Sequence, residues 1–277
     1  MRKHLSTIVI VLLLIIGSAL LVYPSLSNFV NSKRATRVIT SYNDAVVNLA
    51  SEERERIIAE AEEYNKGLKP GSFSEAESDD EYFRKLDITG TGIMGYISIE
   101  RIGVELPIYH GVGKDVLQIG AGHLQGSSLP VGGKGTHCVL SGHRGLPSAK
   151  LFTDLDVLEE GDTFTITVLD RVLTYKVDQI KIVLPTETED LMPVAGEDYC
   201  TLVTCTPYGI NSHRLLVRGT RIETAEEESQ KIYVANEAFK IDTLIVAPIL
   251  AVPMFLLTIA ATFVCSDIKK RRRKKQQ

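Results

Sequence analysis

The stretch Thr201–Gly219, TLVTCTPYGINSHRLLVRG, contains one cysteine and one arginine whose spacing could support covalent chemistry. Two runs of strand-forming residues flank a Pro-Tyr-Gly-Ile-Asn turn, and Cys205 ends the first run while Arg214 begins the second. Pro207 cannot donate to a sheet ladder, so the first strand is expected to end close to Cys205. In an antiparallel hairpin with a loop of this size, the two side chains could be neighbours across one rung.

A cysteine nucleophile needs thiolate character, a group that exchanges its proton, and a donor where an oxyanion forms. Arg214 could supply a permanent positive charge beside the Cys205 thiolate or beside the oxyanion. The alternative is that Cys205 is a small buried apolar residue, which is the commoner fate of a free cysteine. The hairpin alone leaves both interpretations open.

A proton partner for the thiol would have to come from elsewhere in the chain. Five histidines lie between the apolar ends of the sequence, namely His110, His123, His137, His143 and His213. His143 lies in the segment Val139–Gly145, VLSGHRG, after a predicted strand and between two glycines that would let another segment come close. His213 adjoins Arg214 and would point to the opposite face of a regular strand. Composition does not choose among these histidines.

The elements that would position these side chains are short strands. From Gly92 onward, runs rich in β-branched residues and separated by turns predict many strands and few helices, which favours a closed barrel or a sandwich. Earlier in the chain, apolar residues at three- and four-residue steps predict a helix over Ala35–Leu68. The polar segment Lys69–Asp87 that follows predicts a mobile loop or linker.

Three segments of the sequence resemble the sortase family, and in particular the class C, pilin-assembling sortases. Thr201–Gly219 is similar to the family's signature, Thr136–Leu155 to its histidine block, and Ile97–Val112 to its first barrel strands. The Thr-Leu-x-Thr-Cys motif, with an arginine nine residues on and a Ser-Gly-His upstream, is specific. The resemblance covers about Gly92–Ile222.

The resemblance implies a mainly β fold, an eight-stranded sortase-type β-barrel. The apolar patterns of the sequence add an N-terminal helix and a membrane-spanning helix at each end. The resemblance also implies that Cys205 is the nucleophile, His143 the proton donor and acceptor, and Arg214 the stabiliser of the oxyanion. Sortases cut a Leu-Pro-x-Thr-Gly-like (LPxTG-like) sorting signal between Thr and Gly through a thioacyl enzyme. In class C, a lysine amine of the next pilin then attacks, which builds the pilus.

The implied partners are pilin subunits that carry an LPxTG-like sorting signal and an acceptor lysine, and neither a cofactor nor a metal is expected. Two enzymatic alternatives remain, a cysteine hydrolase in which water resolves the thioester and a wall-anchoring transpeptidase. A non-enzymatic surface scaffold is disfavoured because Cys205, His143 and Arg214 are all present.

One departure from the class C pattern concerns the segment Lys69–Asp87. Class C enzymes usually carry a lid, with an Asp-Pro-aromatic type motif, that blocks the cysteine, and this segment has no Asp-Pro. Its aromatic residues are Phe73, Tyr82 and Phe83. We therefore expect a weak or absent lid.

Two long uncharged runs predict membrane spans. Leu5–Leu26 follows the basic residues Arg2 and Lys3, and Thr243–Ser266 precedes the basic tail 269–275. Roughly 20 apolar residues cross a bilayer as a helix, and basic flanks belong on the cytoplasmic side. The expected protein therefore passes twice through the bacterial cell membrane, with its catalytic domain outside the cell and both termini in the cytoplasm.

The charge of the chain and its cysteines bear on its partners and on its core. The net charge is −4 although nine basic residues lie at the two ends, so the middle of the chain is acidic, which argues against a nucleic-acid partner. Cys138 and Cys200 are expected to be core residues, with Cys200 pointing away from Cys205.

The expected divisions of the chain run from one end to the other. They are a cytoplasmic N-terminus (1–4), a signal anchor (5–26), a helical stalk with a lid-like polar loop (27–91), a catalytic barrel (92–224), a linker (225–242), a second span (243–266) and a basic cytoplasmic tail (267–277).

Overall fold

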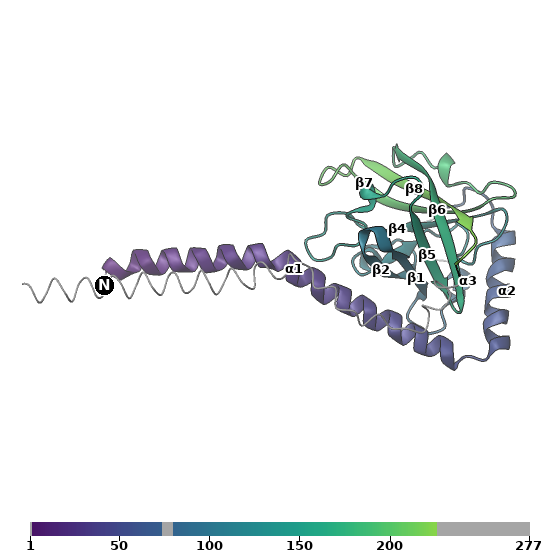
Figure 1. The fold of residues 1–277 in the computed structure, drawn as a ribbon, viewed down its shortest axis with the longest axis horizontal. Coiled ribbons are helices and arrows are strands. Elements are labelled where there is room, and N and C mark those ends of the chain that lie inside the picture. The colour runs from purple at the N-terminus through teal and green to yellow at the C-terminus, as the bar shows by residue number, and fades with distance from the viewer. Residues whose placement is uncertain (1, 74–79, 226–277) are drawn as a thin grey trace, which may run out of the picture. The chain divides into compact units, whose positions relative to one another are not determined.

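Eight strands close into one barrel in the computed structural model, which describes residues 2–73 and 80–225 of the chain (Figure 1). Around the barrel the strand order is β1-β2-β3-β4-β7-β8-β6-β5. The strands are β1 (Ile93–Ile99), β2 (Val104–His110), β3 (Ala121–His123), β4 (Thr136–Ser141), β5 (Thr163–Val168), β6 (Arg171–Val183), β7 (Asp198–Thr206) and β8 (His213–Ile222). The eight-stranded barrel that the sequence predicted is therefore confirmed.

The helices precede the barrel or lie in its connections. They are α1 (Arg2–Asn48), α2 (Ser51–Gly67), α3 (Asp80–Arg84) and α4 (Lys114–Leu117), with short 3₁₀ segments η1 (Glu100–Ile102), η2 (Leu155–Val157) and η3 (Glu189–Leu191). Residues 2–29 and residues 30–225 belong to two different compact units, and the whole barrel lies in the second. The site described below is built entirely within that second unit.

The predicted helix over Ala35–Leu68 is two helices, since α1 ends at Asn48 and α2 begins at Ser51. Ala50 is extended, and Arg54 Nη1 donates to the carbonyls of Val46 (3.2 Å) and Leu49 (3.1 Å), two of the acceptors that the end of α1 leaves open. The break turns the chain so that apolar residues of both helices pack on the barrel core, among them Ile39, Tyr42, Val46, Ile58 and Ala61.

The prediction of a loop or linker over Lys69–Asp87 is wrong for its second half, where α3 forms. Tyr82 of this helix is fully buried, and its hydroxyl lies 2.9 Å from Nδ1 of His123 and accepts a hydrogen bond from the Gly111 amide at 2.9 Å. The sequence did not reveal this buried tyrosine, because the residues around it are mostly acidic and polar. Residues 74–79 lie outside the described part of the chain.

Neither predicted membrane span gains support from the structure. Among the residues that the structure describes, no helix combines the length and the apolar character that crossing a bilayer requires. The predicted span Thr243–Ser266 and the basic tail lie outside the described residues.

Strand alternation separates an inner and an outer face of the barrel. Cys200 and Leu202 of β7 pack in the core with Leu215 and Val217 of β8. The intervening residues of both strands therefore face outward. Cys138 and Cys200 are 3% and 0% exposed, which confirms them as core residues. Cys205, an odd number of positions from Cys200, faces outward, as the sequence predicted.

Candidate active site

Cys205 and Arg214 face each other across one rung of the antiparallel pair β7–β8. The connecting turn is closed by hydrogen bonds from the amides of Ile210 (3.1 Å) and Asn211 (2.9 Å) to the carbonyl of Pro207. Directly opposite residues of antiparallel strands point to the same face, with Cβ atoms about 4.5–5.5 Å apart. The hairpin therefore puts a partly exposed thiol and a guanidinium side by side, as the sequence predicted.

Backbone carbonyls hold the guanidinium of Arg214 at one end. Its Nη1 donates to the carbonyl of His213 at 3.1 Å and to that of Asn211 at 3.4 Å. These bonds tie the arginine to its own turn, so its position follows that of the hairpin. Within the described residues, Nε and Nη2 have no protein acceptor, and they can donate to a substrate.

His143 is brought to Cys205 by the parallel pair β4–β7, in which Ser141 is opposite Val203. Beyond β4, the Gly142 amide donates to the carbonyl of Val203 at 3.0 Å, and the Thr204 hydroxyl donates to the carbonyl of Gly142 at 2.8 Å. The next residue along each segment is His143 on one side and Cys205 on the other. Two strands that are far apart in sequence thus place the imidazole segment directly beside the thiol.

Close packing fixes the segment that carries His143. A Cβ on Gly142 would lie 2.5 Å from the Phe152 ring, and the Phe152 amide donates to the carbonyl of His143 at 3.1 Å. Gly145 has a φ of +77°, and a Cβ there would lie 2.7 Å from the ring of Tyr208 in the β7–β8 turn. Both glycines are therefore required for the close approach that their positions in the sequence predicted.

Burial lowers the pKa of His143 below its ordinary value. The imidazole is then mainly neutral at neutral pH, and a neutral imidazole can accept a proton from a thiol. The adjacent Arg144 is held apart from this exchange, since its Nη2 pairs with Asp156 and its Nη1 donates to the Thr206 hydroxyl at 3.3 Å. Arg144 therefore links the histidine segment to the end of β7, a role that the sequence did not reveal.

The other four histidines have different surroundings. His110, His123 and His137 are buried and contact backbone carbonyls, those of Gly92 and Lys85 for His110, Ser128 for His123 and Met192 for His137. His213 is opposite Thr206 in the ladder and lies one residue before Arg214, so it points to the other face of β8. Of the five candidates, the β4–β7 hydrogen bonds carry His143 alone to the Cys205 position.

An apolar cluster lies on the outer face beside the thiol. It consists of Val139, Leu191 and Leu216, with Phe73, Leu124, Val183 and Val203 packed against it. Val203 and Leu216 are opposite each other on the rung two residues from Cys205 and Arg214, and thus share their face. The sequence showed these residues as ordinary strand positions, and only the barrel register gathers them into one patch.

Phe73 reaches this outer apolar cluster from the segment that follows α2. The carbonyl oxygen of Ser72 is pressed against Gly126, where a Cβ would approach it to 2.2 Å. Phe73 therefore packs against the same apolar cluster as Val203, two residues before Cys205. The expectation of a weak or absent lid stays a prediction.

Comparison with known proteins supports one family. The sortase domain family matches residues 97–222. The solved structure of sortase C1 of Streptococcus agalactiae is 50% identical in sequence and superposes with a TM-score of 0.64. The match covers 68% of this chain and 100% of the sortase C1 chain. Sortase C of Streptococcus pneumoniae gives 44% identity and a TM-score of 0.63 over 68% of this chain and 97% of its own.

A curated relative is more distant. It is sortase A of Streptococcus agalactiae serotype III (strain NEM316), 30% identical over 148 residues, which are 51% of this chain. The match spans 60% of the length of that relative. The structural neighbours, in contrast, are covered almost completely by this chain.

Proposed function

This chain belongs to the sortase family of cysteine transpeptidases, its structural neighbours are class C sortases, and from this premise we propose that it joins pilin subunits. The proposed reaction cleaves an LPxTG-like sorting signal between Thr and Gly. It then transfers the threonyl group to a lysine amine of a pilin. The observation that carries the proposal is the shared rung of Cys205 and Arg214, with the His143 segment hydrogen-bonded beside it.

In the first half of the reaction, His143 accepts the proton of the Cys205 thiol. The thiolate sulfur attacks the threonine carbonyl carbon, and the carbonyl oxygen becomes an oxyanion that accepts hydrogen bonds from Arg214. When the intermediate collapses, the C–N bond to glycine breaks and His143 returns the proton to the leaving amine. A thioester between the threonyl group and Cys205 remains.

In the second half, a neutral lysine amine attacks the thioester carbonyl. The C–S bond breaks, the thiolate leaves, and His143 takes the proton that the amine loses. A thioester retains much of the energy of the cleaved peptide bond, so an amine can compete with water if the site positions the amine and excludes water. The outer apolar cluster beside Cys205 provides such a water-poor surface.

Intact-mass spectrometry tests this function. The protein is incubated with a sorting-signal peptide and a lysine-bearing pilin fragment, with the Cys205→Ala variant as control. We expect the pilin fragment to gain the mass of the peptide without its C-terminal leaving part, and only with the unmodified enzyme. Cleaved peptide without a heavier pilin fragment would favour the hydrolase alternative instead.

We also propose that the protein is held at the bacterial cell membrane with its barrel outside the cell. The support is in the sequence, in the uncharged runs 5–26 and 243–266 and their basic flanks. Membrane fractionation followed by alkaline extraction provides the test. Recovery of the chain in the extracted supernatant would contradict the proposal.

A further inference from the structure

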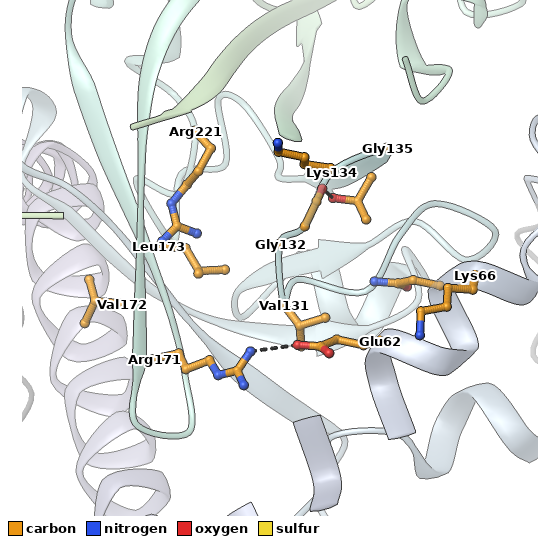
Figure 2. Close-up of a pocket in the computed structure, with 13 residues that line it drawn as sticks. Glu62, Lys66, Val131, Gly132, Lys134, Gly135, Arg171, Val172, Leu173 and Arg221 are labelled. Carbon is orange, nitrogen blue, oxygen red and sulfur yellow. Dashed lines mark hydrogen bonds and ion pairs between the residues drawn. The ribbon is translucent and has the colours of Figure 1, made fainter. Parts of the chain in front are cut away.

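A cavity of about 590 Å³ lies at the end of the barrel where β4 and β7 begin. Four separate segments line it, namely α2, the loop before β4, the start of β6 and the end of β8 (Figure 2). In Figure 2, Arg221 and Leu173 lie on one side, Lys66 and Glu62 on the other, and the loop at Gly132 between them. Pockets that bind small ligands have volumes of about 300–1,000 Å³.

Basic side chains dominate this cavity although the chain as a whole is acidic. The charged lining residues are Lys66, Lys134, Arg171, Arg221 and the single acid Glu62. Arg171 pairs with Glu62 at 2.8 Å, and Lys66 pairs with Glu63 at 3.1 Å. Within the described part of the chain, Arg221 and Lys134 have no carboxylate at ion-pair distance. Two cations are therefore available to a ligand.

Arg221 is held in place rather than free to swing into solvent. Its Nε donates to the carbonyl of Ile222 at 3.2 Å, and its guanidinium carbon lies 5.8 Å from the centre of the Tyr175 ring. Its Nη1 lies close to the glycine loop, because a Cβ on Gly132 would be 3.2 Å away. The guanidinium therefore presents its remaining donors beside the loop.

The loop Val131–Gly135, VGGKG, provides a surface without side-chain bulk. Gly132, Gly133 and Gly135 all have positive φ, at +70°, +121° and +81°. Glycine loops in such conformations let backbone and ligand come close and form concavities that accept anions. Lys134 extends from the middle of this loop.

The carboxylate of Asp198 lies beneath the loop and already accepts hydrogen bonds from the protein. Its donors are the Gly133 amide (2.8 Å) and the Tyr175 hydroxyl (3.0 Å), while the Thr136 hydroxyl donates to the carbonyl of Gly133 at 2.6 Å. Its charge reduces the positive potential of the cavity without ion-pairing with Arg221. The lining still keeps an excess of positive charge.

We propose that this cavity binds a phosphate-bearing ligand with at least two anionic groups. Arg221 and Lys134 would each contact one group, since charge-assisted hydrogen bonds from such side chains to phosphate are among the strongest in proteins. The volume exceeds what one phosphate needs, and Val131, Val172 and Leu173 offer an apolar wall to a carbon-containing linker. A phosphodiester oligomer and a soluble polyphosphate share this chemistry.

The cavity is remote from the catalytic rung. Asp198 and Cys205 lie at opposite ends of β7, seven residues apart, which corresponds to about 23 Å at the usual rise of an extended strand. A ligand in the cavity therefore cannot contact the thioester. The proposal is independent of the transpeptidase function, and its failure would leave that function untouched.

Calorimetric titration of the full-length chain in a non-ionic detergent, at fixed ionic strength, tests the proposal. The probes are tripolyphosphate, a poly(glycerol phosphate) oligomer and citrate. We expect saturable binding that Arg221→Gln weakens at least tenfold, while Lys114→Gln, a change of an exposed lysine on α4 outside the cavity, leaves it unchanged. Stronger binding of the oligomer would identify a phosphodiester polymer, and stronger binding of tripolyphosphate a soluble phosphate.

Lys134→Gln separates a loss of binding from a loss of folding, because Lys134 is exposed and makes no hydrogen bond with another described side chain. This variant is expected to keep the melting temperature and to lose affinity. Equal affinity in Lys134→Gln and the unmodified protein would overturn the proposal. Absence of saturable binding, or citrate binding as tight as phosphate binding, would overturn it as well.

Discussion

Arg214 illustrates how one side chain can be both anchored and reactive. The Nη1 bonds to His213 and Asn211 fix one edge of the guanidinium, and the planar fork then directs its other donors outward beside Cys205. A lysine ammonium would be a mobile point charge without this fork. The geometry of the guanidinium, as well as its charge, should therefore matter.

Arg214→Lys is expected to lower turnover roughly 10²–10³-fold, the usual loss when one oxyanion donor is removed. Steady-state kinetics with a sorting-signal peptide would measure it. Arg218→Lys is the matched control, because Arg218 lies on the same face of β8 but is committed to Asp178 at 2.9 and 3.1 Å. Near-normal turnover of Arg214→Lys would show that charge alone suffices.

Cys205→Ala is expected to abolish turnover and leave the melting temperature nearly unchanged, because the thiol is partly exposed on the outer face. Cys200→Ala should keep turnover and lower the melting temperature. Its side chain is fully buried, and its loss costs roughly 1–2 kcal/mol of stability. Activity assays and thermal melts of both variants check the pair. A collapsed melting transition in Cys205→Ala would make that cysteine structural.

Residue-scale features of the site differed in how far the sequence revealed them. The Cys205–Arg214 rung could be predicted, because the turn residues and the two-residue period of strands are local signals. The position of His143 depends on hydrogen bonds from Gly142 to a strand about sixty residues away. Periodicity carries no information on such non-local pairing, so only the family resemblance could select that histidine.

At the scale of elements, the junction between β4 and β7 positions the proposed catalytic pair, Cys205 and His143. The Thr204 hydroxyl, 2% exposed, donates to the carbonyl of Gly142 at 2.8 Å. The three-residue β3 and the five-residue α3 also brace the barrel, yet both are too short to stand out as patterns. The break between α1 and α2 was missed for another reason, because the apolar spacing continues across it.

Thr204→Val is expected to lower the free energy of unfolding by about 1–3 kcal/mol, because it leaves a buried carbonyl without its donor. Turnover should also fall, since His143 follows Gly142 directly. Urea denaturation and peptide cleavage would measure the two effects. Thr204→Ser retains the hydroxyl and should restore most of both, and if Thr204→Val matched the unmodified protein, the junction would have no positioning role.

Phe73→Ala is expected to speed modification of Cys205 by a thiol reagent about tenfold. Burying a phenyl ring contributes about 1.5 kcal/mol or more, and 1.4 kcal/mol corresponds to tenfold in an equilibrium. Mass spectrometry of time-quenched samples gives the rate. Phe83→Ala, which alters an aromatic residue next to Tyr82 and His110, is the control. An unchanged rate for Phe73→Ala would support the expectation of a weak or absent lid.

Across the whole molecule, buried histidines couple stability to pH. Burial, with a smaller effect of Arg218, lowers the pKa of His137, against opposing effects of Met192, Asp178 and Asp190. In its neutral form Nδ1–H donates to the Met192 carbonyl, and Nε2 accepts from the Thr201 hydroxyl at 2.7 Å. The folded state therefore binds this proton more weakly than the unfolded state does.

Stability should consequently fall as the pH drops below about 6.5, where unfolded histidine begins to protonate and folded His137 does not. Above that pH both states are neutral and this histidine contributes no pH dependence. Urea midpoints at pH 7.5 and 5.5 measure the change, and His137→Gln should show a smaller difference between them. An equal difference in both proteins would exclude His137 as a source.

The closed strand order has a consequence for recognition. Each of the eight strands has a neighbour on both sides for at least part of its length, so no strand is wholly open to an added ninth strand, although Val177–Val183 of β6 pair with β8 alone. Under the proposed function, side chains such as those of the outer apolar cluster would therefore provide most of the contacts to a sorting signal. Residues on that face can be exchanged to accept a different peptide without breaking any rung that holds the barrel together.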